Sequence, residues 1–218
     1  MSRNCWKDSR ARWRMRLTIS FGALALAAAV AGLFRIRGVS GDLLPILEFR
    51  FAQPAVPVAK PGPLAAVPVV SGSAFLLATN SFPQFYGPNR DGVLPGPRLE
   101  TNWAAQPPQV SWRRKVGAAW SGFAIVGAVC VTQEQRGAEE CVVAYETATG
   151  QPLWLQTDPA HYSTTIAGEG PRATPTIVDQ RVFTCGGTGI LNCFDLTTGR
   201  RLWTRDIPAE LGGKVPGW

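Results

Sequence analysis

The chain has 218 residues, 45% of them hydrophobic, and a formal net charge of +7 at neutral pH. The whole excess of positive charge lies in residues 1–37, and the remainder of the chain is neutral. Nucleic-acid-binding domains carry their basic charge on a folded surface, so this distribution argues against a nucleic-acid partner.

The N-terminal region predicts a membrane helix. Residues 17–34 carry no charge and would rise about 27 Å as a helix, close to a hydrocarbon core of about 30 Å. Six basic residues precede this run, so we expect residues 1–16 to be a cytoplasmic tail, residues 17–34 a signal anchor and the remainder exported. The alternative is a cleaved signal peptide, because Ala29-Val30-Ala31 precedes Gly32 in a small-residue cleavage pattern. Either interpretation exports the bulk of the chain.

Residues 35–81 are expected to connect this helix to a folded domain. Residues 35–51 have the size of a juxtamembrane segment, and prolines then recur at positions 54, 57, 61, 63 and 68. Proline at that density is incompatible with a helix or a central strand. We therefore expect a semi-extended tether that separates the folded domain from the membrane.

Strand signals follow an aromatic lead-in at residues 82–92. Short segments rich in Val, Ile, Thr and aromatic residues are bounded by Gly or Asp turns, as β-strands are. A first partial unit is expected to end at Trp112, within residues 110–115. Further strands are expected at 124–132, 141–146, 153–156, 174–178, 181–185, 191–195 and 201–206, with a polar loop at 133–140.

Two of these segments repeat each other. Residues 144–154 recur as residues 193–203, at an offset of 49 residues, with the aromatic, acidic, Thr-Gly and Trp positions retained. A period of about 40–50 residues in short strands predicts an all-β fold of four-stranded antiparallel β-propeller blades. Each tryptophan is expected to pack against the neighbouring blade. The expected blade-docking residues are Thr149, Gly150, Trp154, Thr198, Gly199 and Trp203.

The repeated pattern, Ala/Cys-aromatic-Asp/Glu-x-x-Thr-Gly-x-x-x-Trp, resembles the docking motif of PQQ-type β-propellers, the quinoprotein alcohol dehydrogenase-like and BamB-like superfamily. Residues 170–178 and the lead-in at 82–92 are also similar to bacterial members. WD repeats are disfavoured because no Gly-His or Trp-Asp pairs mark the blades, and kelch repeats remain a weaker rival through Gly186-Gly187. With its N-terminal helix, the chain resembles forms held in the bacterial inner membrane by a single pass, with the propeller on the periplasmic side.

The predicted ring is incomplete in this chain. Residues 82–218 contain two blades and part of an earlier one, whereas propellers close with about 4–8 blades. An open stack would leave an apolar blade face uncovered. We therefore expect the sequence to be the N-terminal portion of a longer protein. The alternative is a ring assembled from several short chains.

The resemblance implies two possible functions. The first is a non-catalytic scaffold or binding module with envelope protein partners. The second is a PQQ-dependent alcohol or sugar dehydrogenase, with PQQ and calcium bound in the full-length protein and the site completed by further blades. No cofactor or activity is expected for these 218 residues alone.

Local candidates for a site are few. Arg172 and Thr174 precede a strand and could face a cofactor, although Arg172 could equally anchor its own loop. Glu134 and Arg136 could form a partner-binding rim, and the alternative is that they lie in a solvated loop. His161 is expected in a loop between blades.

Four cysteines flank turns in two pairs. Cys185 with Cys193, and Cys130 with Cys141, could bridge in an oxidising compartment. Their alternative role is that of small buried apolar side chains. Their spacing does not resemble a zinc site, and no metal-ligand spacing is visible elsewhere.

Overall fold

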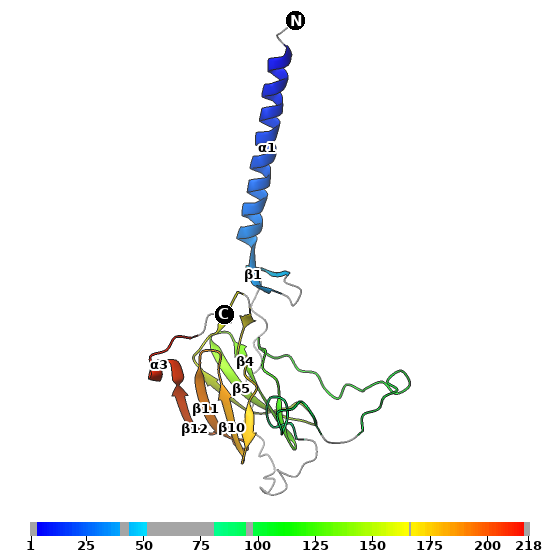
Figure 1. Ribbon diagram of the computed structural model, residues 1–218, viewed down its shortest axis with the longest axis vertical. Helices are drawn as coiled ribbons and strands as arrows, with labels where there is room; N and C mark the ends of the chain where they lie inside the picture. The colour runs from blue at the N-terminus through cyan, green and yellow to red at the C-terminus, as the bar shows by residue number, and fades with distance from the viewer. Residues whose placement is uncertain (1–3, 40–43, 52–80, 95–97, 166, 216–218) are drawn as a thin grey trace. The chain divides into compact units, whose positions relative to one another are not determined.

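A computed structural model describes residues 4–39, 44–51, 81–94, 98–165 and 167–215 (Figure 1). The chain forms two compact units, residues 1–53 and 54–218, which are described separately. Most of the predicted tether, residues 52–80, lies outside the described residues.

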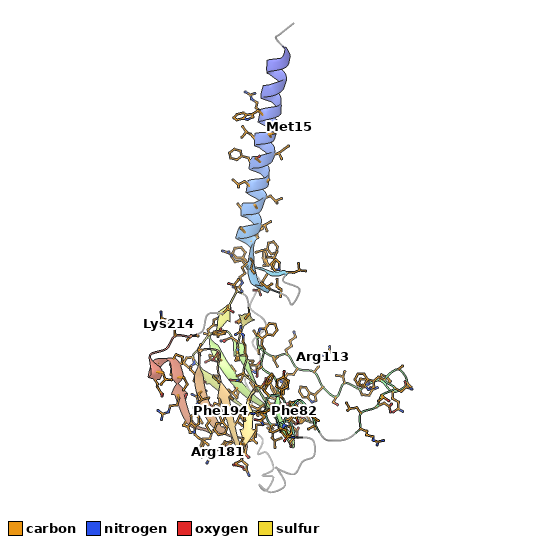
Figure 2. All side chains as sticks on the ribbon, in the orientation of Figure 1. Met15, Phe82, Arg113, Arg181, Phe194 and Lys214 are labelled. Carbon is orange, nitrogen blue, oxygen red and sulfur yellow. The ribbon has the colours of Figure 1, made fainter. Side chains whose placement is uncertain are left out.

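The first unit is a long helix followed by a hairpin. Helix α1 is Asn4–Leu33, and strands β1 (Phe34–Val39) and β2 (Pro45–Phe49) form an antiparallel pair. Within α1, Trp13–Leu33 is 21 residues long with a mean hydropathy of 1.7, and is the one described helix long and apolar enough to cross a membrane. Its side chains project outward without being buried, as at Met15 (Figure 2). A signal sequence has these same properties.

The second unit begins with a four-stranded antiparallel blade. Its strands β3 (Ala124–Val126), β4 (Val129–Arg136), β5 (Glu139–Glu146) and β6 (Pro152–Asp158) pair in chain order. The sequence-based prediction of a polar loop at 133–140 is wrong. These residues continue the β4–β5 ladder as far as the pair Arg136–Glu139, and the chain reverses at Gly137 with φ +60°.

The second blade repeats the same order. Strands β9 (Thr176–Val178), β10 (Arg181–Cys185), β11 (Ile190–Asp195) and β12 (Arg201–Asp206) again pair as neighbours. The minor strands β7 (Ser163–Thr164) and β8 (Gly168–Glu169) form a hairpin in the segment between the blades. Helix α3 (Ile207–Leu211) follows, with the Asp206 side chain accepting from the backbone N–H of Ala209. Two successive blades confirm the predicted fold class.

Apolar side chains from both blades form one core between the two sheets. Burial of this apolar surface stabilises the folded state by about 25 cal/mol for each Å² removed from water. Phe194 lies in this core within the second blade (Figure 2). The buried members are Ala124, Val126, Val129, Val131, Val142, Ala144, Trp154, Ile177, Val182, Phe194 and Leu196.

A tryptophan of one blade lies on the Thr-Gly turn of the next. The indole Nε1 of Trp154 donates to the Leu196 carbonyl oxygen at 2.7 Å. Gly199 approaches so closely, with φ +69°, that a Cβ there would lie 2.6 Å from the Trp154 ring. The turn is held by Asp195, whose carboxylate accepts from the Thr198 N–H and hydroxyl at 2.8 and 2.7 Å. The acid, threonine, glycine and tryptophan of the repeat thus build one joint.

The same joint occurs at the start of the first blade. Trp112 donates from Nε1 to the Thr147 carbonyl oxygen at 2.8 Å, and its ring covers Gly150. Arg114 donates to the Gly150 carbonyl oxygen at 2.7 Å. The described residues at 110–115 form no strand, contrary to expectation. Trp112 nevertheless occupies the position expected for the docking tryptophan of a preceding blade.

The aromatic lead-in lies along the first strands of both blades. Phe82 exchanges two backbone hydrogen bonds of 2.8 Å with Ile125 of β3. The Pro83 carbonyl oxygen accepts from the Ile177 N–H of β9, also at 2.8 Å. The lead-in therefore ties the two blades together through their first strands.

The four cysteines in the second unit are free. Strand register explains this, because Cys185 pairs with Leu191 and not with Cys193, which lies two residues further along β11. Such diagonal neighbours are about 7–8 Å apart, too far for a disulfide. Cys130 and Cys141 are separated by four residues of register in the β4–β5 ladder. The two disulfides considered from the sequence are therefore not formed in this structure.

Candidate functional site

The turns and loops at one end of both blades are the candidate site. In the first blade, β4 and β6 run antiparallel to β5, so both end beside the first residues of β5. The turn at 137–138 and the connection at 159–175 therefore lie at one end of this blade. The turn at 186–189, between β10 and β11 of the second blade, lies at the same end. We call these three segments the loop end. Loops on a rigid β scaffold are the usual location of binding residues.

A buried carboxylate connects the blades at the loop end. Glu140 of β5 is 5% exposed and accepts from the Gly187 N–H at 2.8 Å and from the Thr188 hydroxyl at 3.2 Å. Burial raises the pKa of Glu140, although the hydrogen bonds from Gly187 and Thr188 lower it. A Cβ on Gly186 would collide with this carboxylate. The Gly-Gly pair therefore permits the close approach of Glu140.

A second buried acid joins the outer strands. Asp158 of β6 accepts from Asn192 Nδ2 at 2.7 Å and pairs with the Arg201 guanidinium at 2.7 Å. Arg201 also donates to the Thr157 carbonyl oxygen at 3.0 Å and lies over the Phe194 ring at 5.4 Å. An acid of the first blade is thus neutralised by a base of the second.

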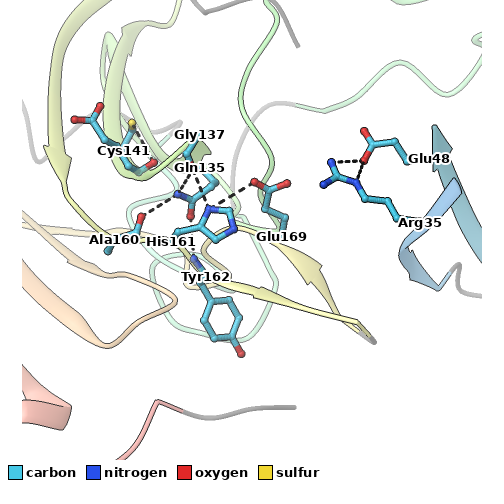
Figure 3. Close-up of polar contacts among 10 residues, drawn as sticks. Arg35, Glu48, Gln135, Gly137, Cys141, Ala160, His161, Tyr162 and Glu169 are labelled. Carbon is cyan, nitrogen blue, oxygen red and sulfur yellow. Dashed lines mark hydrogen bonds and ion pairs between the residues drawn. The ribbon is translucent and has the colours of Figure 1, made fainter. Parts of the chain in front are cut away.

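Gln135 and His161 hold the connection between the blades (Figure 3). The buried Gln135 amide donates to the carbonyl oxygens of Gly137 and Ala160 at 3.0 and 2.9 Å, and accepts from the Tyr162 N–H at 3.2 Å. His161 Nδ1 lies 2.9 Å from the Gly137 oxygen, and a carbonyl can only accept, so Nδ1 carries the hydrogen. The exposed His161 lies in the segment between the blades, where the sequence placed it.

Arg172 and Thr174, the two sequence candidates for cofactor binding, lie at the loop end but contact the protein itself. Arg172 donates to the Ala167 carbonyl oxygen at 2.8 Å and stacks over the Tyr162 ring at 4.7 Å. The Thr174 hydroxyl accepts from the Gly122 N–H at 3.2 Å. Arg172 therefore anchors the segment that connects the blades, and Thr174 joins the end of that segment to residue 122.

Glu134 and Arg136, considered as an exposed rim, are instead part of the interior. The Glu134 carboxylate is 0% exposed and accepts from Arg136, the Gly117 N–H and the Tyr145 hydroxyl. Burial, and then the charge of Glu134, raise the pKa of Tyr145 to about 12. The rim hypothesis is therefore wrong for Glu134, because no atom of this side chain is available to a partner.

Three residues that organise the loop end were not predicted from the sequence: Gln135, Glu140 and Asp158. They lie inside or beside a polar stretch that resembles a solvated loop. The available signal was the symmetric pair of apolar runs around Gly137, which is typical of a long hairpin. Among the described residues, no group of three His, Cys, Asp or Glu side chains is arranged to hold a metal ion.

Comparisons with known proteins support the fold. A family model described as outer membrane protein assembly factor BamB matches residues 98–216, more than half of the chain. The solved structures that are similar include a europium-containing methanol dehydrogenase, at 17% identity and a TM-score of 0.35, covering 47% of this chain and 20% of that one. BamB from Moraxella catarrhalis is similar at 20% identity and a TM-score of 0.15, covering 36% of this chain and 33% of that one. The chain thus spans a third or less of either protein. None of the curated proteins matches it.

Proposed function

Since this chain belongs to the BamB family of PQQ-like β-propeller repeat proteins, we propose that it is a membrane-tethered, extracytoplasmic scaffold that binds envelope proteins. Helix α1 would be the uncleaved anchor, with the basic N-terminus in the cytoplasm and the blades in the periplasm. The blades would present the loop end as a docking surface.

One observation carries this proposal: three charged side chains at the loop end are bonded within the protein, to the second blade or to the connection between the blades. Glu140 accepts from the 186–189 turn, Asp158 pairs with Arg201, and Arg172 holds the carbonyl oxygen of Ala167. These buried ties fix the positions of the loops around them, so the exposed surface of the loop end has a defined shape. Such a surface suits protein docking, since preorganised interfaces lose little conformational entropy on binding.

Quinone chemistry is the alternative, and Arg172 and Thr174 already make contacts within the protein that suit a structural role. In a quinoprotein, PQQ would supply the redox chemistry and the protein would orient the substrate and remove its proton. We therefore favour the scaffold for this chain.

The deciding experiment has two arms on the full chain, the first in detergent micelles and the second in intact cells. The first titrates PQQ with calcium by calorimetry and assays dye-linked alcohol and sugar oxidation. The second cross-links the chain in intact cells and identifies the envelope proteins retained. The scaffold predicts a reproducible protein complex with neither quinone binding nor turnover. Stoichiometric PQQ binding with turnover would overturn it.

The tether is tested separately. An uncleaved anchor keeps the full mass in the membrane fraction after alkaline carbonate extraction. A soluble periplasmic product that begins near Gly32 would replace the tether with a cleaved signal peptide, and would leave the scaffold proposal standing.

A further inference from the structure

The hairpin after helix α1 has one apolar and one charged face. In the β1–β2 ladder, Phe34 pairs with Phe49 and Ile36 with Leu47. Alternation places these four side chains on one side of the hairpin, which we call the apolar face. Arg35 pairs with Glu48 on the other side, with a 2.8 Å ion pair (Figure 3).

The apolar face is exposed within its own unit. Phe34, Ile36, Leu47 and Phe49 are all exposed. The Phe34 and Phe49 rings pack edge to face with their centroids 5.8 Å apart. The Phe51 ring packs on Phe49 in the same way, also with a centroid distance of 5.8 Å. An isolated two-stranded hairpin is marginally stable in water and needs a second surface against its apolar side.

The hairpin is attached directly to the end of the membrane-length helix. Helix α1 ends at Leu33 and β1 begins at Phe34, with no linker. The Arg50 N–H donates to the Leu33 carbonyl oxygen at 2.7 Å, and its guanidinium to the Ala31 carbonyl oxygen at 3.4 Å. These bonds satisfy carbonyls that a helix C-terminus leaves unpaired, and the positive charge suits the helix dipole. The hairpin is therefore held against the end of the helix.

Length places this junction at the membrane boundary. The 21 residues Trp13–Leu33 rise about 31 Å as a helix, which matches a hydrocarbon core of about 30 Å. A helix that spans this core ends at the zone of lipid headgroups, which is about 5–7 Å thick on each side. Aromatic and aliphatic side chains of amphipathic elements bury themselves at this depth.

We propose that the apolar face of the β1–β2 hairpin lies in the lipid bilayer, at the boundary between acyl chains and headgroups of the leaflet where α1 emerges. The Arg35–Glu48 pair on the opposite face meets the headgroups and water. The hairpin would act as a collar that fixes the depth of the anchor. This inference rests on the proposed membrane tether, because a cleaved or soluble helix would not bring the hairpin to a bilayer.

The test uses the full chain in phosphatidylcholine vesicles that contain a lipid with a photoactivatable diazirine on its acyl chain. After irradiation, mass spectrometry locates the lipid adducts on peptides from α1 and from residues 34–50. We expect adducts on both. Adducts confined to α1 would overturn the inference while leaving the tether intact, and an absence of adducts on α1 would reject the tether itself.

Two neighbouring residues provide the matched variants. Leu47 lies on the apolar face and is 55% exposed, and Ile46 lies on the charged face and is 48% exposed. Both belong to strand β2, and their side chains are of the same size. Leu47→Asn is expected to lower the hairpin adducts at least threefold, whereas Ile46→Asn leaves them within the error of the measurement. Equal losses in both variants would contradict the orientation. Leu47→Ile, which keeps an apolar side chain at this position, should give the same number of hairpin adducts as the wild type.

Discussion

Trp154 and Trp203 occupy equivalent positions of two consecutive repeats, yet their environments differ. Trp154 is 2% exposed and Trp203 is 41% exposed. Trp154 donates to Leu196 and covers Gly199 of the next blade, whereas Trp203 contacts Phe183 of its own blade, with ring centroids 6.1 Å apart. The same local sequence therefore becomes a buried joint only where a following Thr-Gly turn is present.

This comparison separates two properties that the repeat combines. The acid and threonine hold the turn locally, as Asp195 does with Thr198. The tryptophan acts only across the blade boundary. Burial raises the pKa of Asp195, but the hydrogen bonds from Thr198 lower it. The lowering prevails, and the pKa of Asp195 falls below its ordinary value. Asp195 and Thr198 thus hold the turn through bonds within one blade, whereas the indole that covers it comes from the neighbouring blade.

The largest effect is expected from removing the buried indole. Trp154→Ala should lower the free energy of unfolding by about 3–5 kcal/mol, because it deletes a buried aromatic ring between the blades. Trp203→Ala should lower it by about 1 kcal/mol or less, since that ring is partly solvated. Urea unfolding of the full chain in micelles, followed by circular dichroism, measures both. Equal losses would contradict the docking role of Trp154.

The next effect concerns the turn glycine. Gly199→Ala should destabilise by more than Gly127→Ala, although both glycines have positive φ, +69° and +58°. Each change costs about 1 kcal/mol for the backbone, but only at Gly199 would the new Cβ meet an indole ring; nothing lies within 4 Å of Gly127. The same unfolding experiment gives the difference. Equal effects would show that the close approach of Trp154 to Gly199 is not required.

A smaller, pH-dependent effect is expected at the loop end. Burial raises the pKa of Glu140 above its ordinary 4.5, and the negative charge of Asp158 also raises it. The stability is therefore fully present below pH 4.5 and declines as pH rises through the raised pKa, because the unfolded state releases the proton first. Besides Asp158, the titratable group beside Glu140 is Cys185, whose own pKa is raised.

Two substitutions isolate this contribution. Glu140→Gln should keep the Gly187 hydrogen bond and flatten the decline of stability above pH 4.5. Glu140→Ala should remove the bond and destabilise at every pH by about 1–3 kcal/mol. Thermal unfolding at several pH values compares them. A decline in Glu140→Gln as steep as in the wild type would assign the pH dependence to another group.

The smallest effect is on thiol reactivity. Burial raises the pKa of Cys130, Cys141 and Cys193, that of Cys141 to about 12. Cys185 is exposed, although burial and Glu140 raise its pKa as well. Among these four thiols, iodoacetamide at pH 8 should therefore modify Cys185 first, as peptide mass spectrometry would show. A disulfide between Cys185 and Cys193 would contradict the observed register.

The strands of the second blade could be predicted because each is a short β-rich run between Gly or Asp turns, and the family match confirms the PQQ-type propeller resemblance. The full length of β4 could not be predicted, because Gln133, Glu134 and Gln135 are polar. The groups that hydrogen-bond to them come from distant segments of the chain. Burial of a polar strand depends on partners that a local pattern does not contain. The β1–β2 hairpin was missed although its signal was present, because Phe34-Arg35-Ile36-Arg37 and Leu47-Glu48-Phe49-Arg50 alternate apolar and charged residues as a strand does.

The most direct test of the account is native-state hydrogen exchange of the full chain, resolved for peptides from β4–β5 and from β10–β11. If the tryptophan joint couples the blades, both regions should open with the same free energy in the wild type, and Trp154→Ala should lower both together. Exchange in β10–β11 that is independent of β4–β5, and unchanged by Trp154→Ala, would contradict the claim that this joint makes the two blades one scaffold.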